Sequence, residues 1–290
     1  MPALLLVLIA VQTEVGPEPG ERHLRSIRQL TAGGQNAEAY FSGSGRLLIF
    51  QRQGPGEGCD QMYIMGLAGN GLHRVSSGRG RTTCGYFYDQ DRRIFYSSTE
   101  RADAACPPRP DNSHGYVWAL YDYDIYTASA DGSGARRLTS HRGYDAEATL
   151  SPDGRTIVFT SLREGDLDVY TMNVDGTNLK RLTTTLGYDG GPFFGPDGKL
   201  IVYRAYHPAT TADSGEYRSL LGRGLVRPTR MDIWVMNADG TGLEQVTTSP
   251  EFDAFPMFSA DGKRLVWASN RHGTAPHETN IFVADWAERP

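Results

Sequence analysis

A segment that repeats along the chain is the strongest constraint on its fold. The residues from Tyr144 to Gly154 recur in similar form at 188–198 and 252–262, and weaker copies begin at Asn36 and Thr82. In the three clear copies, an aromatic residue followed by Asp leads to an Asp-Gly turn, and an alternating apolar run follows. The unit is about 44 residues long, and two units carry insertions of about 20 residues. Such a period indicates an array of similar structural units.

Two further strands follow within each unit. The third strand alternates apolar and other residues, as half-buried strands do, at 62–65, 125–127, 169–172, 233–236 and 281–283. Three of these runs enter an Asp-Gly turn, the strongest short-range signal of a hairpin. A last short strand stands at 74–76, 137–139, 181–183 and 245–247. Four short antiparallel strands in a unit of this length predict the blade of a β-propeller.

The fifth copy of the last strand is displaced to the other end of the sequence. It stands at 27–31, because the chain ends soon after the fifth copy of the third strand. An N-terminal strand that completes the last blade closes the ring and removes free sheet edges. We therefore predict an all-β fold, a single β-propeller of five four-stranded antiparallel blades over residues 22–290. A six-bladed ring is the alternative.

The N-terminal residues are typical of a secretory signal. Residues 3–11 are apolar but too few to span a bilayer, which suits the central part of a signal peptide. No Lys or Arg precedes them, and no clear cleavage motif follows. We predict that residues 1–21 are a signal peptide and linker, and that the protein is periplasmic or otherwise exported, with a cytoplasmic protein as the alternative. No second apolar segment exists, so we expect no transmembrane segment. We also expect a monomer.

Cysteine spacing and charge narrow the function classes. Cys59, Cys84 and Cys106 match neither a zinc ribbon nor a CxxC redox motif. One disulfide with one free thiol suits an exported protein, and three buried thiols are the alternative. The chain has 29 Lys and Arg against 34 Asp and Glu, a net charge of −5. This mild acidic excess argues against nucleic acid as a partner.

The repeats resemble those of the TolB-like, WD-repeat-like β-propellers of bacterial envelope proteins. The resemblance covers nearly the whole chain and rests on 151–154, 159–163, 169–176 and 181–183. It implies a non-enzymatic scaffold that binds a protein or an envelope component. Members usually have six blades, and 245–250 is where this chain would lack one. TolB itself also carries an N-terminal α/β domain, for which the sequence has no room.

Strand order assigns the loops to two faces of the predicted ring. Turns between the first and second strands, and between the third and fourth, are short and share one face. Loops between the second and third strands, and those that enter each blade, share the other, which we call the loop face. Both insertions, 100–123 and 205–230, fall on the loop face. Function concentrates where loops vary on a rigid repeat frame, so we predict partner binding at the loop face and channel mouth.

Equivalent positions at the starts of the innermost strands are expected to converge on the channel. They are Asn36, Thr82, Asp145, Asp189 and Asp253, and Glu38 and Glu147 lie two residues further on in two of the blades. We expect that no cofactor is required, with Ca²⁺ at Asp145, Asp189 and Asp253 as the candidate metal site, because Ca²⁺ takes carboxylate ligands. Alternatively, each Asp caps its own strand entry by accepting backbone hydrogen bonds.

Other candidate residues of the loop face are arginines and aromatic residues. Arg163, Arg204 and Arg271 follow or end the second strands. They would bind carboxylates of a ligand bidentately, or pair with neighbouring acids such as Glu164. Tyr116 and Trp118 belong to an aromatic cluster in an insertion, and exposed aromatic residues are typical interface anchors.

The sequence contains no recognised catalytic motif. There is no nucleophile elbow, HExxH helix, P-loop or dinucleotide-binding glycine motif. Five histidines fall in loops of the loop face: His114, His141, His207, His272 and His277. They leave open a metal-dependent enzyme that acts on carbohydrate or peptide. An accessory propeller that docks substrate for a peptidase is a third hypothesis, and the sequence favours the non-enzymatic scaffold.

Overall fold

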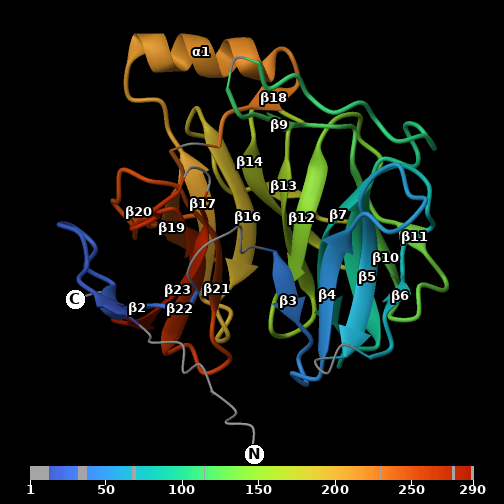
Figure 1. The fold of residues 1–290 in the computed structure, drawn as a ribbon, viewed down its shortest axis with the longest axis horizontal. Helices are drawn as coiled ribbons and strands as arrows, with labels where there is room; N and C mark the ends of the chain where they lie inside the picture. The colour runs from blue at the N-terminus through green and yellow to red at the C-terminus, as the bar shows by residue number, and fades with distance from the viewer. Residues whose placement is uncertain are drawn as a thin grey trace, which may run out of the picture.

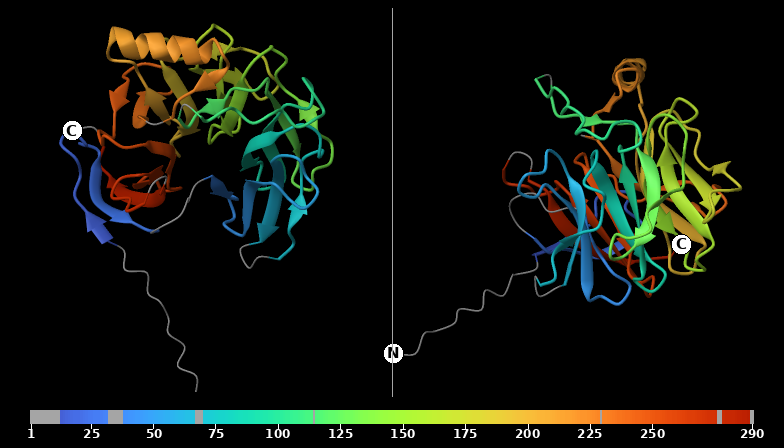
Figure 2. Two further views of the ribbon diagram at one scale, coloured as in Figure 1. Left: turned by 45° about the horizontal axis from the view of Figure 1, so that its top comes forward. Right: turned by 90° about the vertical axis from the view of Figure 1, so that its right-hand side faces the viewer.

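The strands of the protein form five blades around a central axis (Figures 1 and 2). The structure is a computed structural model that describes residues 13–31, 38–66, 70–113, 115–228, 230–275 and 278–288. In each blade, consecutive strands pair antiparallel.

The strands of each blade are named from the innermost outward. Blade 1 contains β3 (Ala39–Phe41), β4 (Leu47–Arg52), β5 (Gln61–Gly66) and β6 (His73–Arg74). Blade 2 contains β7 (Thr82–Tyr88), β8 (Arg93–Ser98), β10 (Asp124–Ser129) and β11 (Arg136–Arg137). Blade 3 contains β12 (Asp145–Leu150), β13 (Thr156–Ser161), β14 (Asp168–Asn173) and β15 (Lys180–Arg181). Blade 4 contains β16 (Tyr188–Phe194), β17 (Leu200–Tyr206), β19 (Asp232–Asn237) and β20 (Glu244–Gln245). Blade 5 contains β21 (Asp253–Phe258), β22 (Arg264–Ser269), β23 (Asn280–Trp286), β2 (Leu24–Gln29) and β1 (Thr13–Val15).

The predicted five-bladed propeller is confirmed, and the six-bladed alternative is wrong. The stretch 245–250, where a blade would be missing, joins the end of β20 to the start of β21 through residues that the structure describes in full. No strand lies between these two elements. The outer strand of blade 4 therefore leads directly into the inner strand of blade 5.

The N-terminal strand completes the last blade, as the displaced repeat predicts. β2 pairs antiparallel with β23, from Leu24 opposite Trp286 to Gln29 opposite Phe282. Leu24 and Ile27 are fully buried and lie in one cluster with Phe282. The two ends of the chain thus share one hydrophobic core.

A hydroxyl of the outermost repeat strand fixes the start of the third strand in every blade. In blade 3, Thr183 accepts a hydrogen bond from the Val169 N–H at 2.9 Å and donates to Asp168 at 3.2 Å. In blade 5, Thr31 does the same with the Ile281 N–H at 2.9 Å and the Asn280 side chain at 3.2 Å. Ser76, Thr139 and Thr247 hold the equivalent N–H groups in blades 1, 2 and 4.

The structure extends upstream of the predicted start of the propeller at residue 22. β1 adds a fifth strand to blade 5, with Val15 opposite Ile27. Glu21 is buried and forms an ion pair with Arg271 at 2.8 Å. Residues 13–21 therefore belong to the fold. The apolar run at 3–11 lies outside the described residues, so the signal peptide stays a prediction.

Aromatic and aliphatic side chains fill the spaces between neighbouring blades. Phe159 of blade 3 and Phe95 of blade 2 lie in one buried cluster, and Tyr203 of blade 4 lies in the next one with Val158 of blade 3. Phe159 and Tyr203 are the aromatic residues that the repeat predicts in the second strands, and Phe95 lies one residue before the predicted Tyr96. Burial of each large side chain contributes about 1.5–3 kcal/mol to the folding free energy.

The innermost strands carry a bulge at their third or fourth residue. The pairing register shifts there in β7, β12, β16 and β21. The bulged residues have positive φ: Cys84 at 54°, Glu147 at 62°, Gly191 at 59° and Phe255 at 58°, and Glu38, before β3, has 55°. A bulge redirects the side chain. As a result, Glu38, Cys84, Glu147 and Gly191 line the central cavity, and the Asp residues two positions earlier do not.

Replacing the hydroxyl of Thr31 tests whether the N-terminal strand is a full member of its blade. Thr31→Ala should lower the free energy of unfolding by about 1–2 kcal/mol, because the Ile281 N–H loses its partner. Thr183→Ala is the matched variant in blade 3, whose strands are consecutive, and a similar loss is expected. Urea unfolding measures both. A loss at Thr183 without one at Thr31 would show that β2 does not hold blade 5 closed.

Candidate functional site

The two insertions meet on the loop face and form a small structure of their own. β9 (Trp118–Ala119) of the blade 2 insertion pairs antiparallel with β18 (Leu225–Val226) of the blade 4 insertion. The helix α1 (Thr211–Leu221) lies above blade 4 beside this pair (Figure 1). Thr210 caps α1 by accepting the Asp213 N–H at 3.1 Å. We call β9, β18 and α1, with their connecting loops, the platform.

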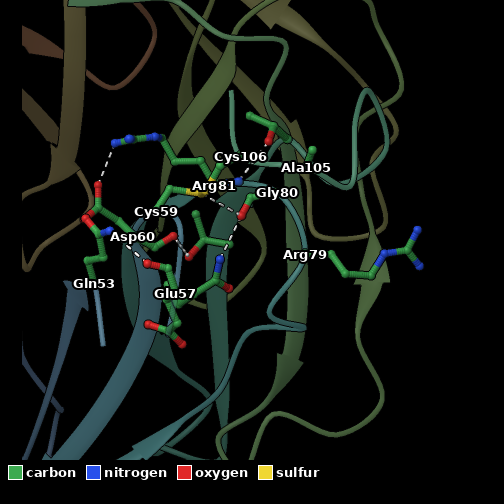
Figure 3. Close-up of a disulfide and its surroundings, with 12 residues drawn as sticks. Gln53, Glu57, Cys59, Asp60, Arg79, Gly80, Arg81, Ala105 and Cys106 are labelled. Atoms are coloured by element: carbon green, nitrogen blue, oxygen red, sulfur yellow. Dashed lines mark hydrogen bonds and ion pairs between the residues drawn. A yellow bond between two sulfur atoms is a disulfide. The ribbon is translucent and has the colours of Figure 1, made fainter. Parts of the chain in front are cut away.

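A disulfide fastens the platform to blade 1. Cys106, in the blade 2 insertion, is bonded to Cys59, in the loop between β4 and β5 (Figure 3). Cys84 is a free thiol in the central cavity. The hypothesis of one disulfide and one free thiol is therefore confirmed, and that of three buried thiols is wrong. Next to the disulfide, Arg81 and Asp60 form an ion pair at 2.6 Å.

Trp118 of the platform covers the mouth of the central channel. Its ring lies 6.4 Å from the ring of Tyr188 and 6.3 Å from the ring of Phe255, centroid to centroid. The guanidinium of Arg204 sits among these rings, 5.4 Å from Trp118, 5.3 Å from Tyr188 and 4.8 Å from Phe255. Cations bind the faces of aromatic rings favourably at such distances. The mouth is thus closed by a buried arginine within three aromatic side chains.

Below the rings, Arg204 joins two blades through an ion pair. It pairs with Glu147 of blade 3 and donates to the Tyr188 hydroxyl at 2.7 Å. Glu147 also accepts from the Thr160 hydroxyl and from the Gly191 N–H, both at 2.7 Å. Both charged side chains are almost fully buried. Additional hydrogen bonds stabilise a buried ion pair, and these contacts help to hold this one in place, although Arg204 Nε is buried without a hydrogen-bond partner.

Gly191 makes room for Arg204. A Cβ at this position would overlap Nη1 of the guanidinium. Its positive φ also favours glycine over any other residue. The sequence signal for this role is slight: the bulge position holds Glu147 and Phe255 in the blades on either side.

The cavity beneath the ion pair is too small for a ligand. It measures about 20 Å³, close to the space that one water needs. Tyr40, Tyr86 and Phe193 close it further down, with ring centroids 5.6 Å apart for Tyr40 and Phe193 and 5.7 Å for Tyr86 and Phe193. The channel is therefore filled by the protein's own side chains.

Two titratable groups in this cavity have raised pKa values. Burial raises the pKa of Glu38 to about 7; Arg204 opposes this shift and Glu147 adds to it. Burial and then the nearby Glu38 and Glu147 carboxylates raise the pKa of the Cys84 thiol well above its usual range. A raised pKa disfavours the thiolate, so Cys84 is poorly suited to act as a nucleophile.

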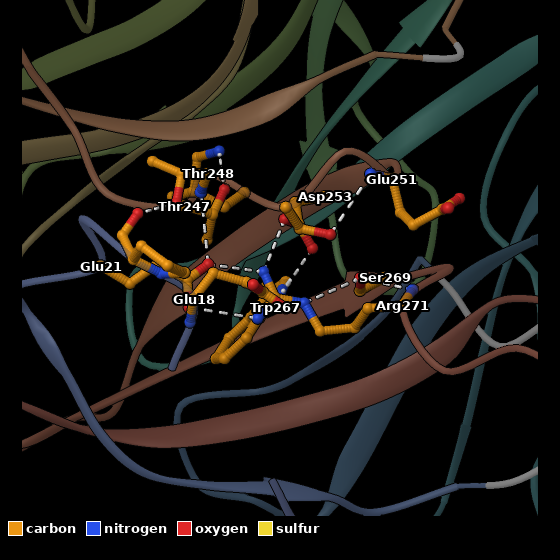
Figure 4. A network of polar contacts seen from close by, with 12 residues as sticks. Glu18, Glu21, Thr247, Thr248, Glu251, Asp253, Trp267, Ser269 and Arg271 are labelled. Atoms are coloured by element: carbon orange, nitrogen blue, oxygen red, sulfur yellow. Dashed lines mark hydrogen bonds and ion pairs between the residues drawn. The ribbon is translucent and has the colours of Figure 1, made fainter. Parts of the chain in front are cut away.

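The predicted Asp residues are each held within their own blade. Asp145 accepts from Arg163 Nη2 at 2.9 and 3.0 Å, and Asp253 accepts from Arg271 at 2.7 Å and from Trp267 at 3.1 Å (Figure 4). The predicted Asp and Arg residues are therefore partners of one another. Arg163 and Arg271 thus pair with acids of the protein, as the alternative predicts, although the partner of Arg163 is Asp145 and not Glu164.

Blade 4 departs from this pattern, and the prediction that groups Arg204 with the other two arginines is wrong. In the strand register, Asp145 faces Ser161 and Asp189 faces Ala205. Two residues after these partners come Arg163 and His207. His207 therefore takes the place of the arginine and bonds Asp189 at 2.9 Å. Arg204 lies within β17 and points into the channel.

The candidate calcium ligands are not brought together. The described residues contain no group of three or more His, Cys, Asp and Glu side chains placed to hold a metal ion. Asp189 and Asp253, like Asp145, are fully buried beside a basic side chain. At the two equivalent positions that do not hold Asp, Thr82 is buried next to the Asp60 carbonyl, and Asn36 lies outside the described residues.

The aromatic cluster of the blade 2 insertion is mostly part of the core of the platform. Tyr123 is buried, and Tyr121 donates to the Pro108 carbonyl at 2.6 Å. Tyr116 is half exposed, and Trp118 is half-buried over the channel mouth. Only Tyr116 of these four has the exposure of an interface anchor. His114 and His277 lie outside the described residues.

Comparison with known proteins supports the fold. The family model of the tricorn protease N-terminal β-propeller domain matches residues 108–231. A TolB homolog from Chlorobium luteolum is 44% identical over 45 residues, which span 16% of this chain and only 10% of that protein. The solved structure of a candidate TolB from Agrobacterium tumefaciens has a TM-score of 0.61 at 17% identity and covers 95% of this chain and 90% of that one. The fold of this chain is therefore similar to that of the β-propeller in the TolB structure.

An enzyme shares this fold as well. A gluconolactonase from Xanthomonas campestris has a TM-score of 0.54 at 14% identity and covers 86% of this chain and 71% of that one. The fold alone therefore does not decide the function of this chain. In the part of the chain that the structure describes, no helix is long and apolar enough to cross a membrane.

Substitution of Gly191 tests the arrangement at the channel mouth. Gly191→Ala should lower the free energy of unfolding by about 3 kcal/mol or more, because a Cβ displaces Arg204 and weakens a buried ion pair. Gly198→Ala is the matched control, since Gly198 also has a positive φ but a Cβ there would meet only Pro152, at an ordinary van der Waals distance of 3.7 Å. It should lose only about 1–2 kcal/mol. Equal losses in chemical denaturation would mean that Gly191 does not position Arg204.

The raised pKa of Glu38 predicts a pH dependence of stability. The folded state keeps a proton that the unfolded state releases, so stability falls as pH rises from 4.5 through about 7. Glu38→Gln should remove this part of the slope and gain stability over the parent at pH 8. Asp168 and Asp232, with pKa values also near 7, add to the parent slope, so the difference between the two proteins is the quantity to measure. Glu164→Gln, at an exposed site, is the control; parallel stability curves for parent and Glu38→Gln would contradict the assignment.

Proposed function

We propose that this chain is a non-enzymatic, exported β-propeller scaffold that binds a protein or envelope partner through the platform on its loop face. The observation that carries the proposal is the pairing of β9 with β18. It joins two insertions from different blades into one surface above the channel mouth. Loops that vary on one side of a rigid frame are where propellers and other repeat folds place their binding sites.

The platform has the support that a binding surface needs. Under it, Tyr123, Tyr144, Tyr188, Tyr217 and Val226 form one buried cluster. The disulfide between Cys59 and Cys106 fixes its other end. A surface held in this way loses little conformational freedom on binding, which favours affinity. Tyr116 offers an exposed aromatic side chain on it.

The interior of the channel gives less support to an enzyme. Trp118 and the Arg204–Glu147 pair block the mouth, and the cavity below has room for about one water. The alternative of a metal-dependent enzyme for carbohydrate or peptide turnover needs a cluster of ligands on the loop face. Across the described ranges, no such cluster of His, Cys, Asp and Glu is present.

Two observations support export. Disulfides persist mainly in oxidising compartments, and this protein contains one that holds its platform. The resemblance to TolB-like repeats of envelope proteins agrees with a periplasmic location. The apolar residues 3–11 would supply the signal.

An accessory propeller that docks substrate for a peptidase is the second candidate function. The match to the propeller of tricorn protease favours it, because residues 108–231 include both strands of the platform. In this case the partner would be a peptidase or its substrate, and the surface used would be the same.

Site-specific photo-crosslinking tests the proposal. A photoreactive phenylalanine at Tyr116 should give discrete adducts in envelope extract, because the side chain is 50% exposed on the platform. Leu243, 40% exposed on the opposite face, is the matched control and should give none. Mass spectrometry of the adduct separates an envelope partner from a peptidase. Adducts from Leu243 alone, or from neither position, would contradict binding through the platform.

A further inference from the structure

A cavity beside α1 has a composition that nothing in the proposed function explains. It measures about 130 Å³ and lies between α1, the end of β17 and the segment that follows β18. α1 supplies Asp213, Glu216 and Leu220 to its lining, β17 supplies Tyr206, and the segment after β18 supplies Arg227 and Arg230. Its acidic groups thus come from one element and its basic groups from another.

Contacts fix the position of most of these side chains. Glu216 and Arg227 form an ion pair at 3.0 Å that ties α1 to the segment after β18. Asp213 accepts from the Thr210 hydroxyl at 2.9 Å. Tyr217 also lines the cavity. It is buried, and its hydroxyl donates a hydrogen bond to Asp166 at 2.6 Å. The walls are therefore ordered by interactions of their own.

Arg230 is the exception among the charged groups. Within the ranges that the structure describes, its guanidinium has neither an ion pair nor a hydrogen bond. Arg230 and the two acids all affect the pKa of the Tyr206 hydroxyl. Burial raises this pKa, the carboxylates of Asp213 and Glu216 raise it further, and Arg230 lowers it. Tyr206 therefore lies in the field of one unpaired cation and two carboxylates.

The size of the cavity limits its ligand to a small molecule. Cavities of about 150 Å³ in other proteins hold benzene, a molecule of about six heavy atoms. Alanine is of this size. Since Glu216 and Arg227 already pair with each other, Asp213 and the exposed Arg230 are the charged groups of the lining with most capacity left for a ligand. A ligand that carries both charges can pair with both of them.

We propose that this cavity binds an α-amino acid through both of its charged ends. The carboxylate pairs with Arg230, the ammonium with Asp213 and Glu216, and the side chain lies against Leu220 and Tyr206. Guanidinium groups bind carboxylates with two parallel hydrogen bonds, and this geometry selects a carboxylate over a simple anion. The cavity lies within the platform, but its test uses small-molecule probes and variants of its own lining, so either proposal can fail without the other.

Calorimetry with three probes tests the site. L-Alanine should bind with measurable heat at millimolar concentration. N-Acetyl-L-alanine, which lacks the ammonium, and L-alaninamide, which lacks the carboxylate, should each bind about tenfold more weakly or worse, because each loses a charge-assisted interaction.

Two variants test which residue binds the carboxylate of the amino acid and which binds its ammonium group. Arg230→Gln should weaken L-alanine to the level of L-alaninamide and leave L-alaninamide unchanged, and Asp213→Asn should weaken L-alanine but leave N-acetyl-L-alanine unchanged. Arg223→Gln, an exposed arginine on the same connection and outside the cavity lining, is the control and should bind as the parent does. Circular dichroism confirms that each variant is folded. Absence of heat with L-alanine, equal binding of the three probes, or no effect of Arg230→Gln would overturn the proposal.

Discussion

The pairing of β2 with β23 is the interaction on which the rest of the structure depends. A propeller blade needs its outer strand to cover the edge of the third, and blade 5 obtains that strand from the other end of the chain. Thr31 then supplies the hydroxyl that Thr183 supplies in blade 3. The propeller thus uses the same polar contact in a blade made of distant segments as in a blade made of consecutive ones.

With blade 5 complete, the bulged inner strands can meet at the channel. Glu147 from blade 3 and Arg204 from blade 4 pair there, with Phe255 from blade 5 against the guanidinium. Three blades are therefore joined at the mouth by one buried arginine. The platform depends on this arrangement, because Trp118 packs on the same group.

The sequence is sufficient to predict the blades because turn chemistry and strand period repeat together. It is not sufficient for the platform. β9 and β18 each have two residues, too few to show a period, and they pair across a separation that no local pattern reports. The helix α1 has only a weak signal, with Thr210 as its cap and Gly215 in its interior. In the candidate site, the repeat predicts the positions of the Asp and Arg residues but not that they pair with each other. It also does not predict the bulge, which places the residue two positions after each Asp, and not the Asp itself, at the channel. Arg204 and His207 can be told apart only from the register of β16 and β17.

The separation of β2 from β23 along the sequence also sets an order in time for the folding of this chain. About 250 residues separate the two strands, so at about 5–20 residues per second β2 waits on the order of tens of seconds for its partner. During this interval Leu24 and Ile27, which end fully buried, have no blade to enter. A chain that is exported unfolded would remain unfolded during this time in any case. Delivery of the whole polypeptide before folding is therefore compatible with a propeller in which β2 is synthesised long before its partner β23.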